Sequence, residues 1–204
     1  MVMGGKSQVL SLTMTDISQE KATYRAQARE HRDKLPAYSM DFERVIEVFF
    51  DEISPDKGQK IAVYWPVGKE FDGRFLMDDL IKRGFTCLLP KVLSDSRVLS
   101  FVTWTPDVEM KKGAFDVMEP NSDEAHDPDI VLAPLLAFDQ RGTRLGQGGG
   151  YYDATIESLR AKKEITYAGP GYSSQAVLFN LPKEDHDQTL DCMVTPDKVA
   201  FCTH

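Results

Sequence analysis

The chain has 204 residues, of which 42% are hydrophobic, and its 24 lysine and arginine residues against 32 aspartate and glutamate residues give a net charge of −8. This length and composition suit one ordinary globular domain, whereas the acidic balance and the lack of a basic cluster argue against nucleic-acid binding. No apolar run reaches the roughly 18 residues of a membrane span, so no membrane partner is expected either.

The amino terminus is predicted to lie outside the fold. Gly4 and Gly5 interrupt any periodicity in residues 1–14, so we expect a flexible leader there and a single domain over residues 15–204. The leader is too polar for a secretory signal. Cys87, Cys192 and Cys202 lack C-x-x-C spacing, which favours buried thiols in a reducing compartment over disulfides or a zinc site. We therefore expect a cytoplasmic protein.

The first predicted helix is mostly polar. Asp16 and Ser18 are two candidates for its N-cap, and Pro36 marks the residue before which it ends. A second helix, with an apolar stripe, is predicted from Ser39 to about Asp51. Four cations recur along the first helix at helical spacing: Lys21, Arg25, Arg29 and Arg32. Such a row is typical of a solvated helix face.

The first predicted strand, Lys60–Trp65, is short, β-branched and aromatic, and Pro66 ends it. Loops beyond the carboxyl ends of strands are where open α/β sheets bind ligands. This loop carries Trp65 and Glu70. The alternative is that Glu70 only caps the next helix or lies in its first turn.

The remaining elements alternate between strand and helix. We expect a helix through Leu76 to Gly84, strands at Thr86–Pro90, Arg97–Trp104 and Ile130–Pro134, an irregular stretch that follows Trp104 and closes with 113–120, a helix at Asp153–Arg160, and strands at Glu164–Ala168 and, last, Leu190–Val194. This order predicts an α/β fold, a single-domain, three-layer sandwich with a central mostly parallel sheet, Rossmann-like in its layering.

The glycine-rich segment from Arg144 to Asp153 is the strongest candidate site. Four of its residues are glycines, and they lie between a predicted strand and a helix N-terminus, where backbone N–H groups and the helix dipole favour phosphate. A plain flexible turn is the alternative reading. Arg144 offers a planar fork for phosphate, and Asp153 offers a hard oxygen ligand for Mg²⁺. A later run, Glu184-Asp185-His186-Asp187, is either a second set of metal ligands or solvated charge.

Together these segments resemble the 5-formyltetrahydrofolate cyclo-ligase family, from Lys21 to Thr195. The likeness rests on ordered blocks: Lys21-x-x-x-Arg25, Tyr64 with Glu70-Phe71-Asp72, Glu119-Pro120, the stretch from Pro134 through Phe138-Asp139 and Arg144-Leu145-Gly146 to Asp153, then Gln175, Leu181-Pro182, His186-Asp187 and Val194-Thr195.

The resemblance implies cyclisation of 5-formyltetrahydrofolate to 5,10-methenyltetrahydrofolate with ATP as co-substrate and Mg²⁺ as cofactor. We expect a monomer. The resemblance assigns catalysis to Arg144 and Tyr152, and the metal to Asp153 and Asp187. The implied ATP-binding residues are Lys21, Arg25, Arg144, Leu145, Gly146, Gln147, Gly148, Gly149, Gly150, Tyr151 and Tyr152. The implied folate-binding residues are Trp65, Glu70, Gln147, Gly148, Gly149, Gly150 and Tyr151. Arg29 and Arg32 stay solvated in this reading.

Four residues, at three places in the chain, depart from the family pattern. Gly73 stands where a threonine often follows Glu-Phe-Asp, and Phe115-Asp116 stands where a Gly-Ile pair is usual. Gly149 replaces a basic residue of some members. These departures leave two alternatives open: a paralogue that acts on another formylated or pterin-like substrate, and a non-catalytic protein that binds folate or nucleotide.

Overall fold

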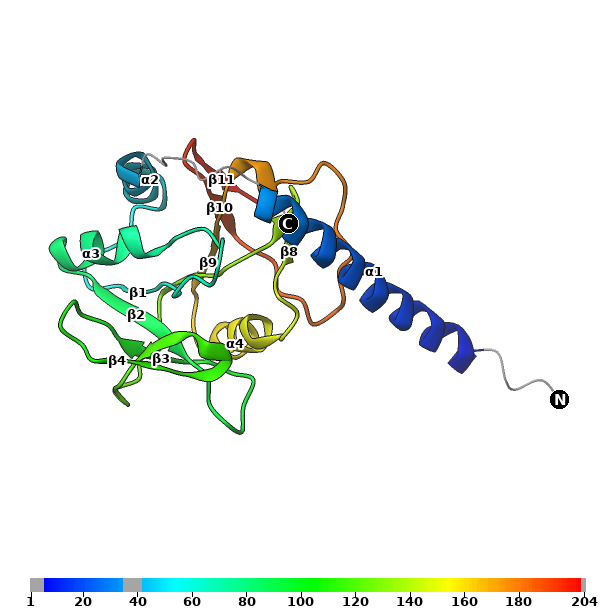
Figure 1. Cartoon of the computed structure of the whole chain (residues 1–204), viewed down its shortest axis with the longest axis horizontal. Coiled ribbons are helices and arrows are strands. Elements are labelled where there is room, and N and C mark those ends of the chain that lie inside the picture. Colours follow the sequence, from blue (N-terminus) through cyan, green and yellow to red (C-terminus); the bar gives the residue numbers. More distant parts are fainter. Residues whose placement is uncertain (1–5, 35–41, 203–204) are drawn as a thin grey trace.

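The central sheet of the protein contains seven strands: β1 (Lys60–Ala62), β2 (Thr86–Lys91), β3 (Ser100–Thr103), β6 (Ile130–Leu132), β9 (Thr166–Pro170), β10 (Cys192–Val194) and β11 (Val199–Phe201). They lie in the order β11-β10-β9-β6-β1-β2-β3 in the computed structural model, which describes residues 6–34 and 42–202 (Figure 1). The inner strands pair in parallel, and only the edge strands β3 and β11 pair antiparallel with their neighbours.

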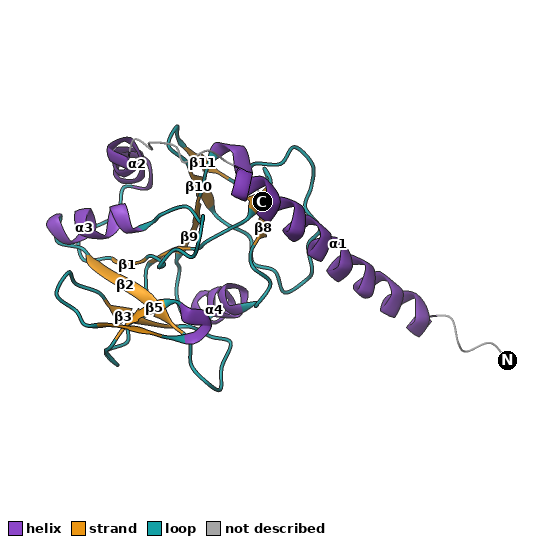
Figure 2. Cartoon of the chain, in the orientation of Figure 1, coloured by secondary structure: helices purple, strands orange, loops and turns teal. Residues whose placement is uncertain are grey.

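Helices cover both faces of this sheet (Figure 2). On one face lie α2 (Phe42–Val48), which continues as the π-helix Phe49–Ile53, and α3 (Arg74–Lys82), while α4 (Tyr151–Arg160) lies on the other. Successive strand residues point to opposite faces: Ile61 packs in the core with α2 and α3, and Ala62 packs in the core with α4. The predicted three-layer α/β fold with a mostly parallel sheet is confirmed.

Helix α1 (Lys6–Lys34) lies outside the three layers, and its N-terminal part points away from the rest of the protein (Figure 1). Its Tyr24 packs against a small cluster that contains Leu145 and Leu181. The predicted helix start at Asp16 or Ser18 is wrong, and the expected leader is helical from Lys6, because no glycine or proline interrupts the chain over this helix. Residues 1–5 of that leader, and the expected start of the second helix at Ser39, lie outside the described residues. Within those residues, no helix is long and apolar enough to cross a membrane.

Short strands account for the other differences from the sequence prediction. The stretch expected to be irregular contains a hairpin of β4 (Met110–Lys112) and β5 (Met118–Pro120), and β7 (Ala137–Phe138) pairs with β8 (Arg144–Leu145). The strand expected to be last is followed by β11. Each of these strands has two or three residues, too few to show a period of two.

The three cysteines are unpaired, and two are buried, as predicted. Burial raises the pKa of Cys87 and of Cys192 to about 12, and that of the more accessible Cys202 to about 11. Because the thiolate is the reactive form, we expect an aromatic disulfide reagent at pH 8 to label Cys202 slowly in the native protein and the other two only after unfolding. In a Cys202→Ser variant, native labelling should disappear; labelling of Cys87 at the rate of a free thiol would contradict the burial.

Candidate active site

The site lies where the sheet changes its winding direction. Strands β1 and β6 are neighbours, but the chain leaves β1 through α3 to β2 on one side, and leaves β6 through α4 to β9 on the other. Open α/β sheets hold ligands at the carboxyl ends of such strands. Here the loop after β1 carries Glu70, and the chain after β6 leads into the glycine segment (Figure 1).

The glycine segment has the backbone that its sequence predicts. Gly148 and Gly150 adopt φ values of +103° and +70°, a region that favours glycine. Gly150 is the N-cap of α4 and makes no side-chain cap hydrogen bond. The first N–H groups of a helix have no intrahelical partners and carry the positive end of the helix dipole. The segment can therefore accept an anion at the start of α4.

Arg144 is buried against this segment, with its side chain 6% exposed. Its Nη1 donates to the carbonyl of Pro134 at 3.1 Å, and its Nη2 pairs with Asp153 at 3.2 Å. A Cβ on Gly146 would lie 2.5 Å from Nη1, so only glycine lets the guanidinium pack this closely. Burial acts to lower the pKa of Arg144, but Tyr167 and Asp153 beside it outweigh burial and raise it. Arg144 thus fixes the carboxylate of Asp153 and supports the loop.

Two tyrosines enclose the same guanidinium. Its Cζ lies 5.5 Å from the ring centre of Tyr152 and 5.8 Å from that of Tyr167. Burial raises the pKa of both phenols far above neutrality. Tyr152 is therefore a hydroxyl that can donate a hydrogen bond at pH 7, and it is not a base. Tyr151, which precedes it, packs its ring edge-on against Phe115 at 5.7 Å.

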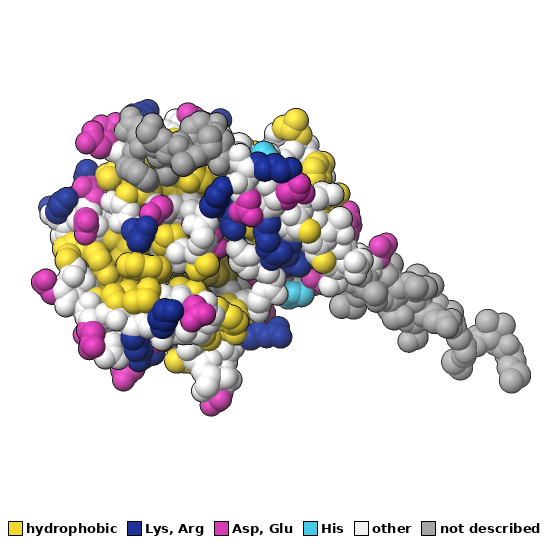
Figure 3. All heavy atoms as spheres, in the orientation of Figure 1, with side chains coloured by type: hydrophobic (Ala, Val, Ile, Leu, Met, Phe, Trp, Pro, Cys, Tyr) yellow, Lys and Arg dark blue, Asp and Glu magenta, His cyan; other side chains and the backbone are white. Residues whose placement is uncertain are grey.

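The cations of α1 reach the glycine segment. Arg25 Nε donates to the carbonyl of Gly146 at 3.1 Å, and its guanidinium lies 3.3 Å from the position of a Cβ on Gly148. Arg29 donates to both the side-chain and the backbone oxygen of Gln147, at 3.2 Å each. Arg29, predicted to be solvated, is partly exposed and also contacts the glycine segment. Figure 3 shows lysine and arginine side chains gathered where α1 meets the rest of the molecule.

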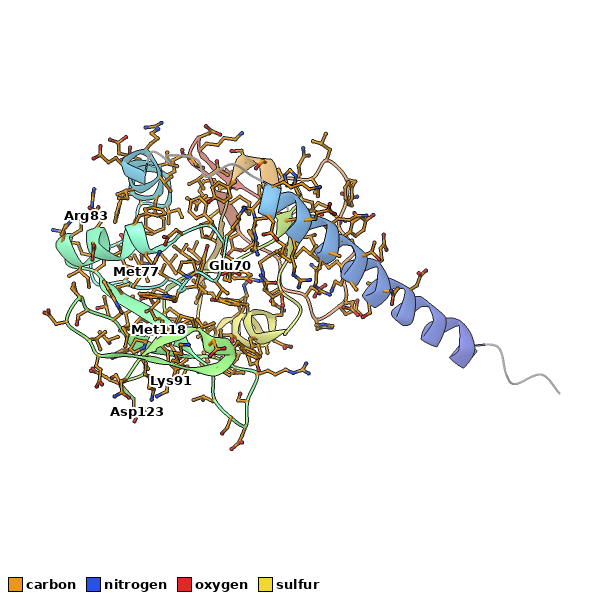
Figure 4. All side chains as sticks on the ribbon, in the orientation of Figure 1. Glu70, Met77, Arg83, Lys91, Met118 and Asp123 are labelled. Atoms are coloured by element: carbon orange, nitrogen blue, oxygen red, sulfur yellow. The ribbon has the colours of Figure 1, made fainter. Side chains whose placement is uncertain are left out.

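Glu70 lies in the interior of the molecule, below the end of α1, and is 8% exposed (Figure 4). Its Oε1 accepts from Gln147 Nε2 at 2.9 Å, and its Oε2 accepts from the backbone N–H of Val67 at 3.0 Å. Because α3 begins at Arg74 with Gly73 as its N-cap, the reading of Glu70 as a helix cap is wrong. Arg32 lies beside Glu70 and is also 8% exposed, so the prediction that Arg32 is solvated is wrong as well.

An apolar surface accompanies these polar groups. Trp65, near the start of the loop after β1, is partly buried and has the guanidinium of Arg74 5.2 Å from its ring centre. Phe75 and Met110 are among the other partly buried hydrophobic side chains on the α2 and α3 side of the core. Figure 3 shows hydrophobic side chains gathered in a band between α3 and β4. A flat aromatic ligand has apolar surface to cover here.

Carboxylates meet the cations from the carboxyl-terminal part of the chain. Lys21 is 4% exposed, and its Nζ pairs with Asp187 and, at 2.7 Å, with Glu184. The backbone N–H of Gln188 donates to Asp153 Oδ1 at 3.1 Å, which places this segment beside α4. Single ligand atoms of Glu184, His186 and Asp187 lie within 4.8 Å of one another. The alternative that these carboxylates are only solvated charge is wrong for Glu184 and Asp187, which hold a buried lysine.

These carboxylate groups fit Mg²⁺. The ion prefers hard oxygen ligands, usually one or two carboxylates together with phosphate oxygens and water. Asp153 and Asp187 supply such oxygens from neighbouring elements, α4 and the segment that contacts it. Softer donors are scarce in this set, since His186 is its only nitrogen ligand. The composition of the set therefore suits Mg²⁺ better than Zn²⁺.

Sequence reasoning missed Arg29 and Arg32 as members of this site, and it missed the pairing of Glu184 with Lys21. The helical spacing of the cations on α1 predicts that they share one side of the helix, and that side lies against the glycine segment and Glu70. Glu184 is separated from Lys21 by 163 residues, so no local pattern could join them.

Comparisons with known proteins lead to one family. A model described as the 5-formyltetrahydrofolate cyclo-ligase family matches residues 17–196. The 5-formyltetrahydrofolate cyclo-ligase of Haemophilus influenzae is 30% identical over 181 residues, which cover 85% of this chain and 96% of that protein. The Escherichia coli K12 protein of the same name is 32% identical over 146 residues, 68% of this chain and 79% of its own length.

The fold leads to the same proteins. The solved structure of Aquifex aeolicus 5,10-methenyltetrahydrofolate synthetase has a TM-score of 0.73 and 28% sequence identity, and the match covers 90% of this chain and 93% of that one. The shared sheet therefore comes with shared sequence over nearly the whole length of both proteins. The chain belongs to the 5-formyltetrahydrofolate cyclo-ligase family of enzymes.

Proposed function

We propose that this protein catalyses the ATP- and Mg²⁺-dependent cyclisation of 5-formyltetrahydrofolate to 5,10-methenyltetrahydrofolate, with release of ADP and phosphate. The observation that carries the proposal is the meeting of three segments at one place. Arg25 contacts the glycine segment, Asp153 lies in the first turn of the helix that follows it, and Lys21 contacts Asp187. A phosphate loop, cations and carboxylates at one sheet edge are the parts that phosphoryl transfer from ATP needs.

The chemistry requires the formyl oxygen to become a leaving group. That oxygen attacks the γ-phosphorus of ATP, and ADP leaves. The second bridging nitrogen of the folate then attacks the formyl carbon and loses its proton. The carbon–oxygen bond breaks, inorganic phosphate departs, and the methenyl bridge between the two nitrogens remains. No protein nucleophile takes part in these steps.

The protein residues position these groups and balance their charge. Arg25 and the N–H groups of the glycine segment would hold ATP phosphates. Tyr152, a protonated hydroxyl, would donate a hydrogen bond to an oxygen that gains negative charge. Mg²⁺, held by Asp153 and Asp187, would neutralise phosphate charge when bound. Glu70 and Trp65 would bind the pterin ring, as the family resemblance implies.

The exposed ring of Phe115 supports a second candidate, a paralogue with the same ATP site and another formylated pterin-like substrate. Phe115 is 71% exposed, adopts a φ of +56°, and contacts Tyr151 of the glycine segment. A bulky ring at this position, where a Gly-Ile pair is usual in the family, narrows the approach to the loop.

A single assay separates these functions. We expect the purified protein, mixed with 5-formyltetrahydrofolate and Mg²⁺, to produce the absorbance of the methenyl compound only when ATP is added, together with an equal amount of ADP. Folate binding without product would favour a non-catalytic binding protein. ADP formation with another formylated pterin, but none with 5-formyltetrahydrofolate, would favour the paralogue.

A further inference from the structure

Arg32 is a buried cation whose hydrogen-bonding capacity is not used. Its side chain is 9% exposed. Its Nε and Nη1 are fully covered and have no hydrogen-bond partner among the residues that the structure describes. Buried polar groups are almost always paired, because an unpaired donor loses its hydration without compensation. Two unpaired donors on one buried guanidinium therefore indicate that an acceptor is missing from this position.

Glu70 is the nearest carboxylate, but it does not supply that acceptor. Arg32 Nη1 lies 3.9 Å from Glu70 Oε1, beyond hydrogen-bond distance. Both oxygens of Glu70 already accept from other groups, Oε1 from Gln147 and Oε2 from Val67. Gln147 itself is held from its other side by Arg29, which donates to its side-chain oxygen. The position thus holds an acceptor, Glu70 Oε1, filled by a side-chain amide, and beside it an unfilled donor, Arg32 Nη1.

The chemistry of the missing group follows from this pair. An acceptor with a donor next to it is complementary to a ligand edge that presents an N–H next to a carbonyl oxygen, which is the edge of a cyclic amide. The amide of Gln147 now donates to Glu70 as the N–H of such an edge would. A pterin ring carries this edge at its ring nitrogen N3 and its oxygen O4.

We propose that Arg32 recognises the pterin oxygen O4 by donating a hydrogen bond to it, while Glu70 accepts from the adjacent N–H in place of Gln147. This inference rests on the proposed function, since it assumes that the folate reaches Glu70. In this role Arg32 selects 4-oxo pterins over rings with an amino group at that position. An amino group there would point its N–H at the N–H of Arg32, and neither group could accept a hydrogen bond.

The test compares two ligands on the full-length protein. Binding is measured by calorimetry without ATP, for 5-formyltetrahydrofolate and for its analogue with an amino group in place of O4. We expect the wild-type protein to prefer the 4-oxo compound, and Arg32→Met to reduce that preference by about tenfold to a hundredfold, the usual effect of one hydrogen bond to a charged group. The KM for ATP should change by less than about threefold, since a lost folate contact leaves the phosphate contacts in place.

Control variants separate recognition from folding. Lys34→Met removes an exposed cation from the same helix, two residues after Arg32 in the chain. It should leave the preference for the 4-oxo compound as in the wild type. The melting temperature of ligand-free Arg32→Met tests whether this variant folds: removal of two unpaired donors favours stability, and loss of the buried ion pair with Glu70 opposes it. If this variant does not fold, Arg32→Lys, which keeps the charge but loses the fork, permits the same comparison.

Two outcomes would overturn the inference in different ways. Tight binding of 5-formyltetrahydrofolate by both proteins with an unchanged preference would overturn the role of Arg32 alone and leave the proposed function standing. A wild-type protein that binds neither compound would overturn the proposed function, and this inference with it.

Discussion

Replacing Asp153 by asparagine is expected to lower turnover by at least about a hundredfold, the upper end of what changes around a metal site cost. The carboxylate lies in the first turn of α4, where it pairs with Arg144 and accepts from the N–H of Gln188. Asparagine has a similar shape but no charge, so it is a poor ligand for Mg²⁺. We expect the Mg²⁺ concentration for half-maximal rate to rise as turnover falls.

The same substitution should destabilise the protein without unfolding it. Arg144 is buried and loses its charged partner, which costs about 3–5 kcal/mol when a buried pair is broken. Asparagine keeps an oxygen that can accept from Arg144, so the loss should lie at or below that range. A domain of ordinary stability, about 5–15 kcal/mol, remains folded after such a loss. Thermal unfolding followed by circular dichroism checks this.

Asp191→Asn is the matched control. Like Asp153, Asp191 pairs with an arginine and accepts from a backbone N–H. Its partners are Arg160, at 2.9 Å, and the N–H of Tyr167. It has no place in the proposed metal site. We expect a lower melting temperature for this variant and an Mg²⁺ dependence like that of the wild type. Wild-type turnover in Asp153→Asn, or an equal shift of the Mg²⁺ dependence in both variants, would contradict the role of Asp153.

The sequence predicts those parts of the site that one continuous segment builds. The glycines, the helix after them and Asp153 lie within a short stretch, so backbone freedom and helix polarity are visible in the order of residues. The strands on either side of the switch point are apolar enough to be found as well. Their order in the sheet then places Glu70 and the glycine segment at the same edge.

The row of cations on α1 shows where prediction from sequence ends. Periodicity places Lys21, Arg25 and Arg32 near one side of a helix, but a solvated row and a row that faces a site have the same spacing. The difference depends on where α1 docks, and that depends on contacts such as Tyr24 with the Leu145 and Leu181 cluster. These contacts join segments far apart in the chain, so the burial of Arg32 becomes visible only in the fold.

Replacing Gly148 by alanine should lower the apparent affinity for ATP by up to about tenfold, less than the roughly hundredfold that a displacement on the order of 1 Å in a catalytic site can cost. The added Cβ would lie 3.3 Å from both Cζ and Nε of Arg25, so the guanidinium must shift by a few tenths of an ångström. This shift would strain the 3.1 Å hydrogen bond from Arg25 to Gly146 and move the guanidinium relative to a bound phosphate. Initial rates at varied ATP concentration measure the effect.

Gly58→Ala is the control that separates the effect of backbone strain from the effect of the contact with Arg25. Gly58 has a φ of +91°, close to the +103° of Gly148, but a Cβ there would meet no atom within 4 Å. Gly58→Ala therefore carries the strain of a left-handed alanine, about 1–2 kcal/mol, and no displaced side chain. Both variants should melt at lower temperature, and only Gly148→Ala should bind ATP more weakly. Equal ATP affinity in the two variants would mean that the glycine segment is only a flexible turn, since displacing Arg25 would then leave nucleotide binding unchanged.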